Sequence, residues 1–251
     1  MIIDHSAHAT HAKNRQTINA WIDAAIPRLY GGVYPVPEGR DPEAVLRAAI
    51  LTERLLHCAD PFEVVRLAEV AARLILTEPG AVVLITGSPG VGKSSLATLI
   101  LRILVELIWT NDWEANPITS NSGLFRDPDG LGLWNSRGVM WTSAFELFDT
   151  ERGGGTSDLM RDLQRVPLAV IDDIGLEGED ARIKSTEAVV AARREGLRST
   201  ILITSKVDPP RDRWSHDYFY PLRQRYGVTF VSRVFEEGRR SAMHIHMSKK
   251  Y

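Results

Sequence analysis

Short apolar runs alternate along this chain with longer stretches in which apolar side chains recur every three or four residues. The short runs occupy residues 81–86, 138–141, 167–173, 200–205 and 242–247. Such runs, rich in β-branched residues, are typical of strands that a parallel sheet buries on both faces. The intervening spacing is typical of helices with one packed face. We therefore expect an α/β fold with a parallel five-stranded sheet flanked by helices.

Two helices are expected ahead of the first strand. Asp41 and Asp60 each precede a proline, an arrangement that places a capping side chain before a proline at the first helical position. Glu63 lies three residues after Asp60 and predicts a capping box for the second helix. Later helices are expected from Ser95 onward and over residues 143–148, 157–163 and a stretch that ends near Arg193. The apolar face of the second helix consists of Val64, Leu67, Ala68, Ala71, Leu74 and Ile75.

The chain divides into two parts by composition. Residues 1–57 combine a polar tail, an amphipathic piece at 17–30 and a link rich in Gly and Pro, and they predict a small helical N-terminal region. Residues 58–251 then form the α/β domain. Within it, residues 111–137 are rich in Asn, Asp, Gly and Pro and predict a long surface insertion, a class of segment that often carries function.

Composition excludes several classes of protein. The 251 residues are 44% hydrophobic and 25% charged, which favours a soluble globular protein over a disordered or membrane one. A net charge of −2 predicts no overall attraction to nucleic acid, although it leaves room for a local basic face. A single cysteine, Cys58, forms no internal disulfide, and the N-terminus lacks the pattern of a secretory signal. We expect a cytoplasmic protein.

The strongest motif is a glycine-rich loop between the first apolar run and the helix that follows it. Residues 87–94 read GSPGVGKS and match G-x-x-x-x-G-K-[ST]. Glycines let successive backbone N–H groups and the helix N-terminus face one concavity that accepts phosphate. Lys93 would then reach the terminal phosphates of ATP, and the Ser94 hydroxyl would coordinate Mg²⁺. The predicted nucleotide-binding residues are Gly87, Ser88, Pro89, Gly90, Val91, Gly92, Lys93, Ser94 and Ser95.

A second motif is the pair of acids at the end of the third apolar run, LAVIDD. Asp172 is the candidate second ligand of Mg²⁺. Asp173 is the candidate to orient or activate an attacking water, since a carboxylate in hydrogen-bond reach of that water serves as a base. The alternative is that the two acids only cap the next helix.

Further candidates follow the fourth apolar run. Ser205 and Lys206 lie where a polar side chain would sense the terminal phosphate. Arg233 is the candidate arginine finger, supplied to a neighbouring subunit, and its alternative is an ordinary surface arginine. Residues 211–233 interleave arginines with aromatic residues, which suits either single-stranded DNA or ordinary packing. His244 and His246 fall on one side of the last strand, where a structural or solvated role is the default.

Taken together, these motifs resemble the DnaC/IstB type of AAA+ ATPases, the branch of helicase loaders and transposition helpers. The resemblance covers residues 58–235 and rests on GSPGVGKSS, SDLMRDLQRVPLAVIDDIG, STILITSK and FVSRVFEE. It implies that residues 87–94 bind nucleotide, that Asp172 and Asp173 form the Mg²⁺ and water site, and that Arg233 acts in trans. It also implies that the divergent residues 1–57 grip the partner protein.

Two departures from that family pattern affect the prediction. The sensor position, typically Asn in this branch, is Lys206, which would place a cation near the terminal phosphate and alter the rate of hydrolysis. The sequence after residue 247 leaves no room for a helical lid, so we expect no C-terminal lid domain.

The resulting hypothesis is a Mg²⁺-dependent ATPase of DNA metabolism that forms nucleotide-dependent homo-oligomers and assembles on single-stranded or double-stranded DNA. A replicative helicase is the first choice of partner, and a transposase is the alternative. A second class is an ATP-gated assembly module with negligible turnover. A third, a small-molecule kinase, would need an acceptor pocket and an arginine-bearing lid.

Overall fold

The computed structural model describes six segments of the chain: residues 59–110, 139–152, 158–177, 184–206, 220–235 and 241–248. The expected helical region at residues 1–57 and the expected insertion at 111–137 lie outside these segments, as does the sequence after Ser248 on which the lid prediction rests.

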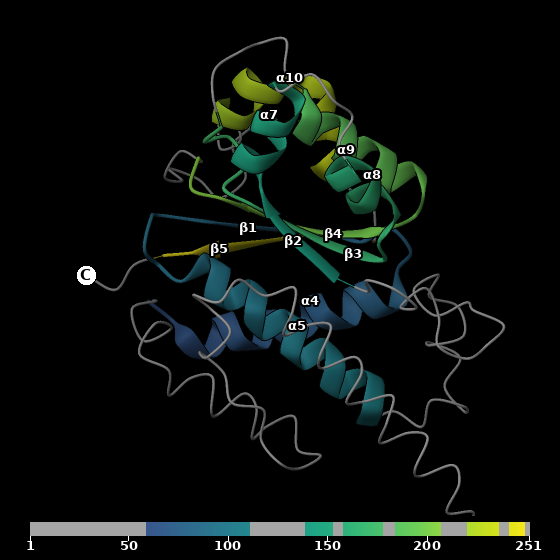
Figure 1. Ribbon diagram of the computed structural model, residues 1–251. Helices are drawn as coiled ribbons and strands as arrows, with labels where there is room; N and C mark the ends of the chain where they lie inside the picture. Colours follow the sequence, from purple (N-terminus) through teal and green to yellow (C-terminus); the bar gives the residue numbers. More distant parts are fainter. Residues whose placement is uncertain are drawn as a thin grey trace, which may run out of the picture.

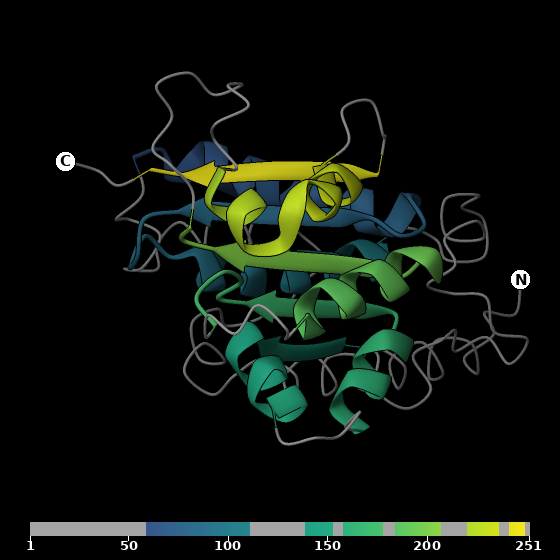
Figure 2. The ribbon, with the colours of Figure 1, turned by 90° about the horizontal axis from the view of Figure 1, so that it is seen from above.

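A parallel five-stranded sheet forms the centre of the molecule, as expected (Figure 2). Its order is β2-β3-β4-β1-β5. The first strand in the chain therefore lies inside the sheet, between β4 and β5. The carboxyl ends of β1 and β3 both flank β4. The strands are β1 (Val82–Gly87), β2 (Val139–Ser143), β3 (Leu168–Asp172), β4 (Ser199–Thr204) and β5 (Ala242–Met247).

Helices cover both faces of the sheet, so the described part of the chain has three layers (Figure 1). Below the sheet in this view lie α4 (Pro61–Thr77) and α5 (Lys93–Thr110), which pack on each other. Above it lie α7 (Ala144–Arg152), α8 (Asp158–Arg165), α9 (Ser185–Glu195) and α10 (Tyr220–Phe235). The fold is thus α/β, as the alternation of apolar runs predicts.

Alternating residues of the inner strands build two cores. In β1, Val83 and Ile85 join the core under α4 and α5, whereas Val82 and Leu84 join the core under α7 to α10. Every residue of β1, β3 and β4 is buried. Because helices cover both faces of the sheet, these runs carry no alternation of apolar and polar residues. Burying one such side chain stabilises the fold by roughly 1.5–3 kcal/mol.

Arg193 ties the amino-terminal ends of β3 and β4 to the end of α8. Its side chain is completely buried, and burial lowers its pKa to about 9, so the guanidinium still carries its charge at neutral pH. The charge is met by backbone carbonyls near a helix C-terminus, where the helix dipole favours a cation. The acceptors are the carbonyl oxygens of Leu163, Val166, Pro167 and Ser199 and the hydroxyl of Thr200.

Several element boundaries differ from the sequence expectation. Helix α5 begins at Lys93, ahead of the expected Ser95, so the lysine and serine of the glycine-rich loop belong to its first turn. Helix α10 was not predicted, because Gly227 (φ 84°, ψ 164°) breaks it into two helical pieces and interrupts its periodicity. At α4, Asp60 accepts from the Glu63 amide as expected, but the Glu63 carboxylate pairs with Arg66 and does not complete the capping box.

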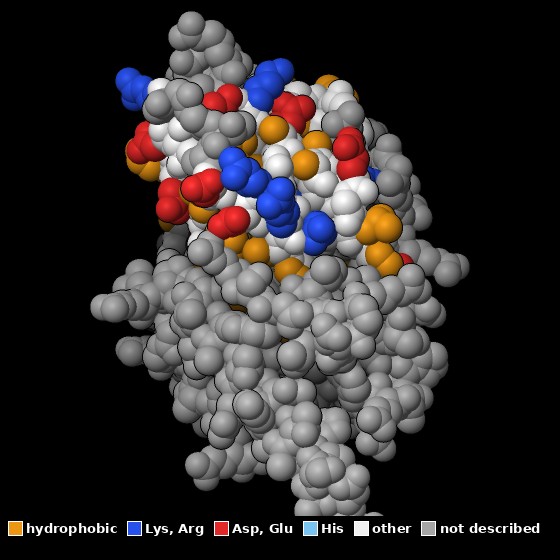
Figure 3. Space-filling view, turned by 45° about the vertical axis from the view of Figure 1, so that its right-hand side comes forward, with side chains coloured by type: hydrophobic (Ala, Val, Ile, Leu, Met, Phe, Trp, Pro, Cys, Tyr) orange, Lys and Arg blue, Asp and Glu red, His pale blue; other side chains and the backbone are white. Residues whose placement is uncertain are grey.

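The surface of the α7–α10 side carries both signs of charge. In the upper part of the face in Figure 3, Lys and Arg side chains stand among Asp and Glu side chains. A single basic face is therefore not a feature of this described surface, in keeping with the net charge of −2. Within the described segments, no helix combines the length and the hydropathy that crossing a bilayer requires.

Candidate functional site

The glycine-rich loop joins β1 to α5 at the carboxyl edge of the sheet. Gly87 has φ 149°, and a Cβ atom there would lie 2.3 Å from the Met247 carbonyl oxygen of β5, so no larger residue fits. Gly90 has φ 77°, a conformation that glycine adopts at little cost, and a Cβ atom there would meet nothing within 4 Å. The loop therefore bends tightly and leaves open space at its tip.

The predicted nucleotide-binding residues divide by exposure around this loop. Ser88, Pro89 and Gly90 are exposed at the tip, whereas Val91 and Ser95 are buried and anchor it to the core. An exposed run of backbone followed by a buried helix start is the arrangement that directs amide groups toward a bound anion.

Lys93 lies in the first turn of α5 with its ammonium group turned back onto the loop. The Lys93 Nζ donates to the carbonyl oxygens of Gly87 and Ser88, each at 3.0 Å, and the side chain is buried. A cation is thus held at the N-terminus of a helix, whose dipole also favours negative charge. Both features suit a phosphate group.

Ser94 and Asp172 meet although they are far apart in the sequence. The Ser94 Oγ donates to the Asp172 Oδ2 at 2.8 Å. The contact exists because β1 and β3 end at the same edge of the sheet, on either side of β4. Burial raises the pKa of Asp172, while the hydrogen bond from Ser94 opposes that rise. The pair offers a hydroxyl and a carboxylate oxygen, the donor types that Mg²⁺ prefers.

Asp173 follows β3 in an unusual conformation. Its φ is 57°, in the left-handed region that Asp tolerates better than most residues. Its amide donates to the Asp172 Oδ1 at 2.8 Å, and its carbonyl accepts from the Leu176 amide at 3.1 Å, which closes a turn. The residue is exposed at the edge of the sheet, beside the Ser94–Asp172 pair.

Thr204 links the turn after Asp173 to the end of β4. Its Oγ1 donates to the Ile174 carbonyl at 2.7 Å and accepts from the Lys206 amide at 2.9 Å. The Ile174 amide donates in turn to the Ile203 carbonyl at 2.9 Å. Sequence reasoning singled out Ser205 and Lys206 and missed Thr204, because the strand ends one residue earlier than expected.

Ser205 and Lys206 lie close to the same turn. Ser205 is half-buried and Lys206 is exposed. A Cβ atom on Gly175 would lie 3.3 Å from both the Cβ and the Cγ of Lys206, so the lysine stem passes directly over this glycine. The structure therefore brings Lys206 to the loop that follows Asp173. A sensor role for Ser205 and Lys206 stays a prediction.

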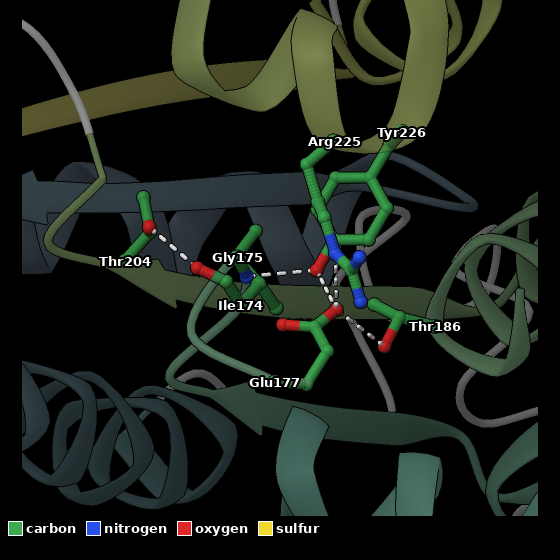
Figure 4. Close-up of polar contacts among 7 residues, drawn as sticks. All are labelled: Ile174, Gly175, Glu177, Thr186, Thr204, Arg225 and Tyr226. Atoms are coloured by element: carbon green, nitrogen blue, oxygen red, sulfur yellow. Dashed lines mark hydrogen bonds and ion pairs between the residues drawn. The ribbon is translucent and has the colours of Figure 1, made fainter. Parts of the chain in front are cut away.

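A buried polar cluster lies between the turn at residues 173–177 and helix α10 (Figure 4). The Tyr226 hydroxyl of α10 accepts from the Gly175 amide at 2.8 Å and donates to the Glu177 Oε1. The same Oε1 faces the Thr186 hydroxyl at 3.5 Å and the Arg225 Nε at 4.0 Å. Burial, followed by the charge of Glu177, raises the pKa of Tyr226, so its hydroxyl keeps its proton.

The cluster was not found from the sequence. Tyr226 was seen only as one member of the aromatic and basic stretch 211–233, and Glu177 carried no signal. The Tyr226 ring packs on Phe230, with 4.6 Å between ring centroids, which favours the packing interpretation for this residue. Residues 211–219 lie outside the described segments.

Arg233 lies in the second piece of α10, but its side chain is not among those that the structure describes. Its proposed action on a neighbouring subunit stays a prediction.

The residues at this edge fit ATP and Mg²⁺. The open space at Gly90 and the buried Lys93 suit phosphate groups, and the Ser94–Asp172 oxygens suit a hard cation. Carboxyl ends of strands next to a change in strand order are also where open α/β sheets bind ligands.

No family model matches the chain, and no curated protein matches it. Solved structures do: the DnaC helicase loader is similar, with a TM-score of 0.49, 21% identity and coverage of 75% of this chain and 89% of that one. DnaI is similar with a TM-score of 0.45, 17% identity and coverage of 74% and 84%. AMPPCP-bound DnaA from Aquifex aeolicus is similar with a TM-score of 0.43, 15% identity and coverage of 84% and 51%. Identity at this level concerns the fold alone. The chain itself has a parallel β2-β3-β4-β1-β5 sheet with a glycine-rich loop after β1, which is the α/β class of fold that its sequence predicts.

Proposed function

We propose that this chain is a Mg²⁺-dependent ATPase of DNA metabolism that assembles on DNA and a protein partner. The observation that carries the proposal is the 2.8 Å hydrogen bond between Ser94 and Asp172. It joins the glycine-rich loop to the acids at the end of β3, which are the two halves of a phosphoryl-transfer site.

Each residue at the site has a distinct role in this proposal. Lys93 binds the terminal phosphates as a point charge, and the loop amides orient them. Ser94 and Asp172 hold Mg²⁺, which neutralises charge on the phosphates when it is bound. Asp173 accepts a proton from the attacking water, and its exposed position beside the pair supports that role. Arg233 acts on the site of a neighbouring subunit.

A replicative helicase is the proposed partner, and residues 1–57 are the proposed contact. The support is the resemblance of the sequence to helicase loaders. A transposition helper uses the same ATPase core, and the difference lies in the partner surface. Pull-down with the tagged full-length chain and ATP distinguishes a helicase loader from a transposition helper. Recovery of a transposase in place of a replicative helicase would make the transposition helper the preferred function.

An ATP-gated assembly module with negligible turnover is the second candidate. Lys206 favours it, because its stem passes over Gly175 in the loop after Asp173, from which its ammonium group could reach a bound nucleotide. Such a cation near the terminal phosphate would stabilise the bound nucleotide as well as the transition state, and uniform stabilisation does not accelerate the reaction.

Phosphate release from ATP, with and without single-stranded or double-stranded DNA, tests the proposed activity. We expect turnover by the wild-type chain and a loss of about 100-fold or more in Asp173→Asn, with nucleotide affinity retained. Asp149→Asn, an exposed carboxylate in α7, is the matched control and keeps full turnover. Absence of turnover in every condition rejects the ATPase and leaves the assembly module.

A further inference from the structure

The loop at residues 173–177 holds Asp173 through its backbone rather than through its side chain. In the described part of the chain, the Asp173 carboxylate accepts no hydrogen bond, and its position depends on a backbone at φ 57°. For a residue other than glycine that conformation is unfavourable and persists only where the surroundings enforce it.

The loop is attached to the rest of the fold on two sides. On the sheet side, Ile174 is bonded to Ile203 and Thr204 of β4. On the helix side, the Tyr226 hydroxyl bridges two loop residues at once, since it accepts from the Gly175 amide and donates to Glu177. Tyr226 thus links the loop to α10 through hydrogen bonds to two of its residues.

The helix side is built as a rigid support. The Glu177 side chain is 3% exposed, and its Oε1 accepts from the Tyr226 hydroxyl while Thr186 and Arg225 face the same atom. Tyr226 in turn packs on Phe230, which is 2% exposed in the core under α7 to α10. A hydrogen-bonded cluster packed against the core in this way restricts the groups that it contacts.

We propose that Tyr226 and Glu177 are positioning residues for Asp173, an inference that rests on the hydrolysis proposed above. Their hydrogen bond, together with the bond from Gly175, sets the path of the 173–177 loop and so the direction in which the Asp173 carboxylate points. Among the described residues, the hydrogen bonds and ion pairs of Tyr226 and Glu177 go to Gly175, Thr186 and Arg225 and to each other, and not to the phosphate loop. Their effect therefore falls on turnover and not on nucleotide affinity, because a base displaced by about 1 Å loses up to 100-fold in rate.

The test compares two tyrosines on the same helix. Tyr226→Phe removes the bridging hydroxyl, and Tyr220→Phe removes the hydroxyl of an exposed tyrosine, which accepts from Gln224 at 2.9 Å. With the full-length chain, well below the melting temperature of each variant, we expect Tyr226→Phe to lower kcat about tenfold or more. The dissociation constant for a fluorescent ATP analogue changes by less than about twofold. Tyr220→Phe matches the wild type in both.

A second measurement separates positioning from general damage. In single-turnover hydrolysis of radiolabelled ATP, Tyr226→Phe has less than about a twofold further effect in an Asp173→Asn background, because the residue that it positions is already disabled. Equal losses in the two backgrounds overturn the inference, as does wild-type kcat in Tyr226→Phe. Either result leaves the ATPase intact, whereas a wild-type chain without turnover rejects the ATPase and this inference together.

Discussion

Single residues at the carboxyl edge of the sheet supply charges of both signs. Lys93 is buried against loop carbonyls, and Asp172 is buried against Ser94 and the Asp173 amide. Each charged group is hydrogen-bonded, as burial requires. The residue types were readable from the sequence because both motifs are contiguous. Their contact partners were not, since they come from segments far apart in the chain.

Lys93→Ala is expected to weaken ATP binding, because the cation that faces two phosphates is lost. A charge-assisted hydrogen bond of about 1.5–3 kcal/mol corresponds to a roughly 10–100-fold rise in the dissociation constant. Titration with a fluorescent ATP analogue measures it. Lys184→Ala, an exposed lysine ahead of α9, is the control. Unchanged affinity in Lys93→Ala contradicts the phosphate site.

His244 and His246 make stability sensitive to acid. Both rings contact the Thr86 hydroxyl, His244 Nε2 at 2.8 Å and His246 Nδ1 at 3.1 Å. That hydroxyl donates to only one of the two rings, so one ring must present an unprotonated nitrogen. Burial, followed by the neighbouring His246, lowers the pKa of His244 to about 4.

His244 thus accepts a proton near pH 6.5 in the unfolded chain but only near pH 4 in the folded chain. The resulting contribution to the free energy of unfolding is present above pH 6.5 and is lost as the pH falls toward 4. The Nε2 of His244 meets the fully buried Thr86, but the residue as a whole is exposed, so solvent screening keeps the effect small. Urea unfolding at about pH 7 and about pH 5 is expected to show a larger loss for the wild type than for His244→Gln. Equal losses would argue against the assignment.

At the scale of elements, the apolar runs located all five strands, and β5 matches its expected bounds at 242–247. Helices with clear start signals were also found, since Asp60 and Pro61 mark the beginning of α4. Helix α10 was missed because Gly227 interrupts its periodicity, and because its two pieces are also held by contacts with distant segments, including Tyr226 with Glu177. The spacing of apolar residues within a short segment does not indicate such contacts.

Arg193→Met is expected to destabilise the fold by about 3–5 kcal/mol, because several buried carbonyls lose their donor and the new side chain offers none. The free energy of unfolding from urea titration measures this loss. Arg161→Met removes a surface pair with Asp158 at 3.2 Å and is expected to cost less than about 1 kcal/mol. If Arg193→Met lowers the free energy of unfolding by no more than Arg161→Met does, the buried guanidinium does not stabilise the fold as expected.

At the scale of the whole molecule, the site described here is one side of the proposed catalytic centre. The glycine-rich loop, the acids and the 173–177 loop come from a single chain, whereas Arg233 is proposed to serve another. Arg233→Ala is therefore expected to retain ATP binding and to lose at least about tenfold in hydrolysis, in the assembled state only.

Size-exclusion chromatography with a non-hydrolysable ATP analogue, with and without single-stranded DNA, defines the assembled state for that measurement. We expect the wild type and Arg233→Ala to assemble alike. An equal loss of hydrolysis in a strictly monomeric sample would refute action across a subunit boundary.

The sequence by itself determined the strands, the start of α4, the phosphate loop and the acid pair, because each depends on residues that are neighbours in the chain. Only the tertiary structure decided that Ser94 meets Asp172, that Thr204 rather than Ser205 bridges to Ile174, and that Tyr226 holds the loop after Asp173. The physical reason is the order of the strands and the position of α10. The sheet places β4 between β1 and β3, and α10 lies over the upper face of the sheet. Both features bring together residues that are far apart in the sequence and share no local pattern.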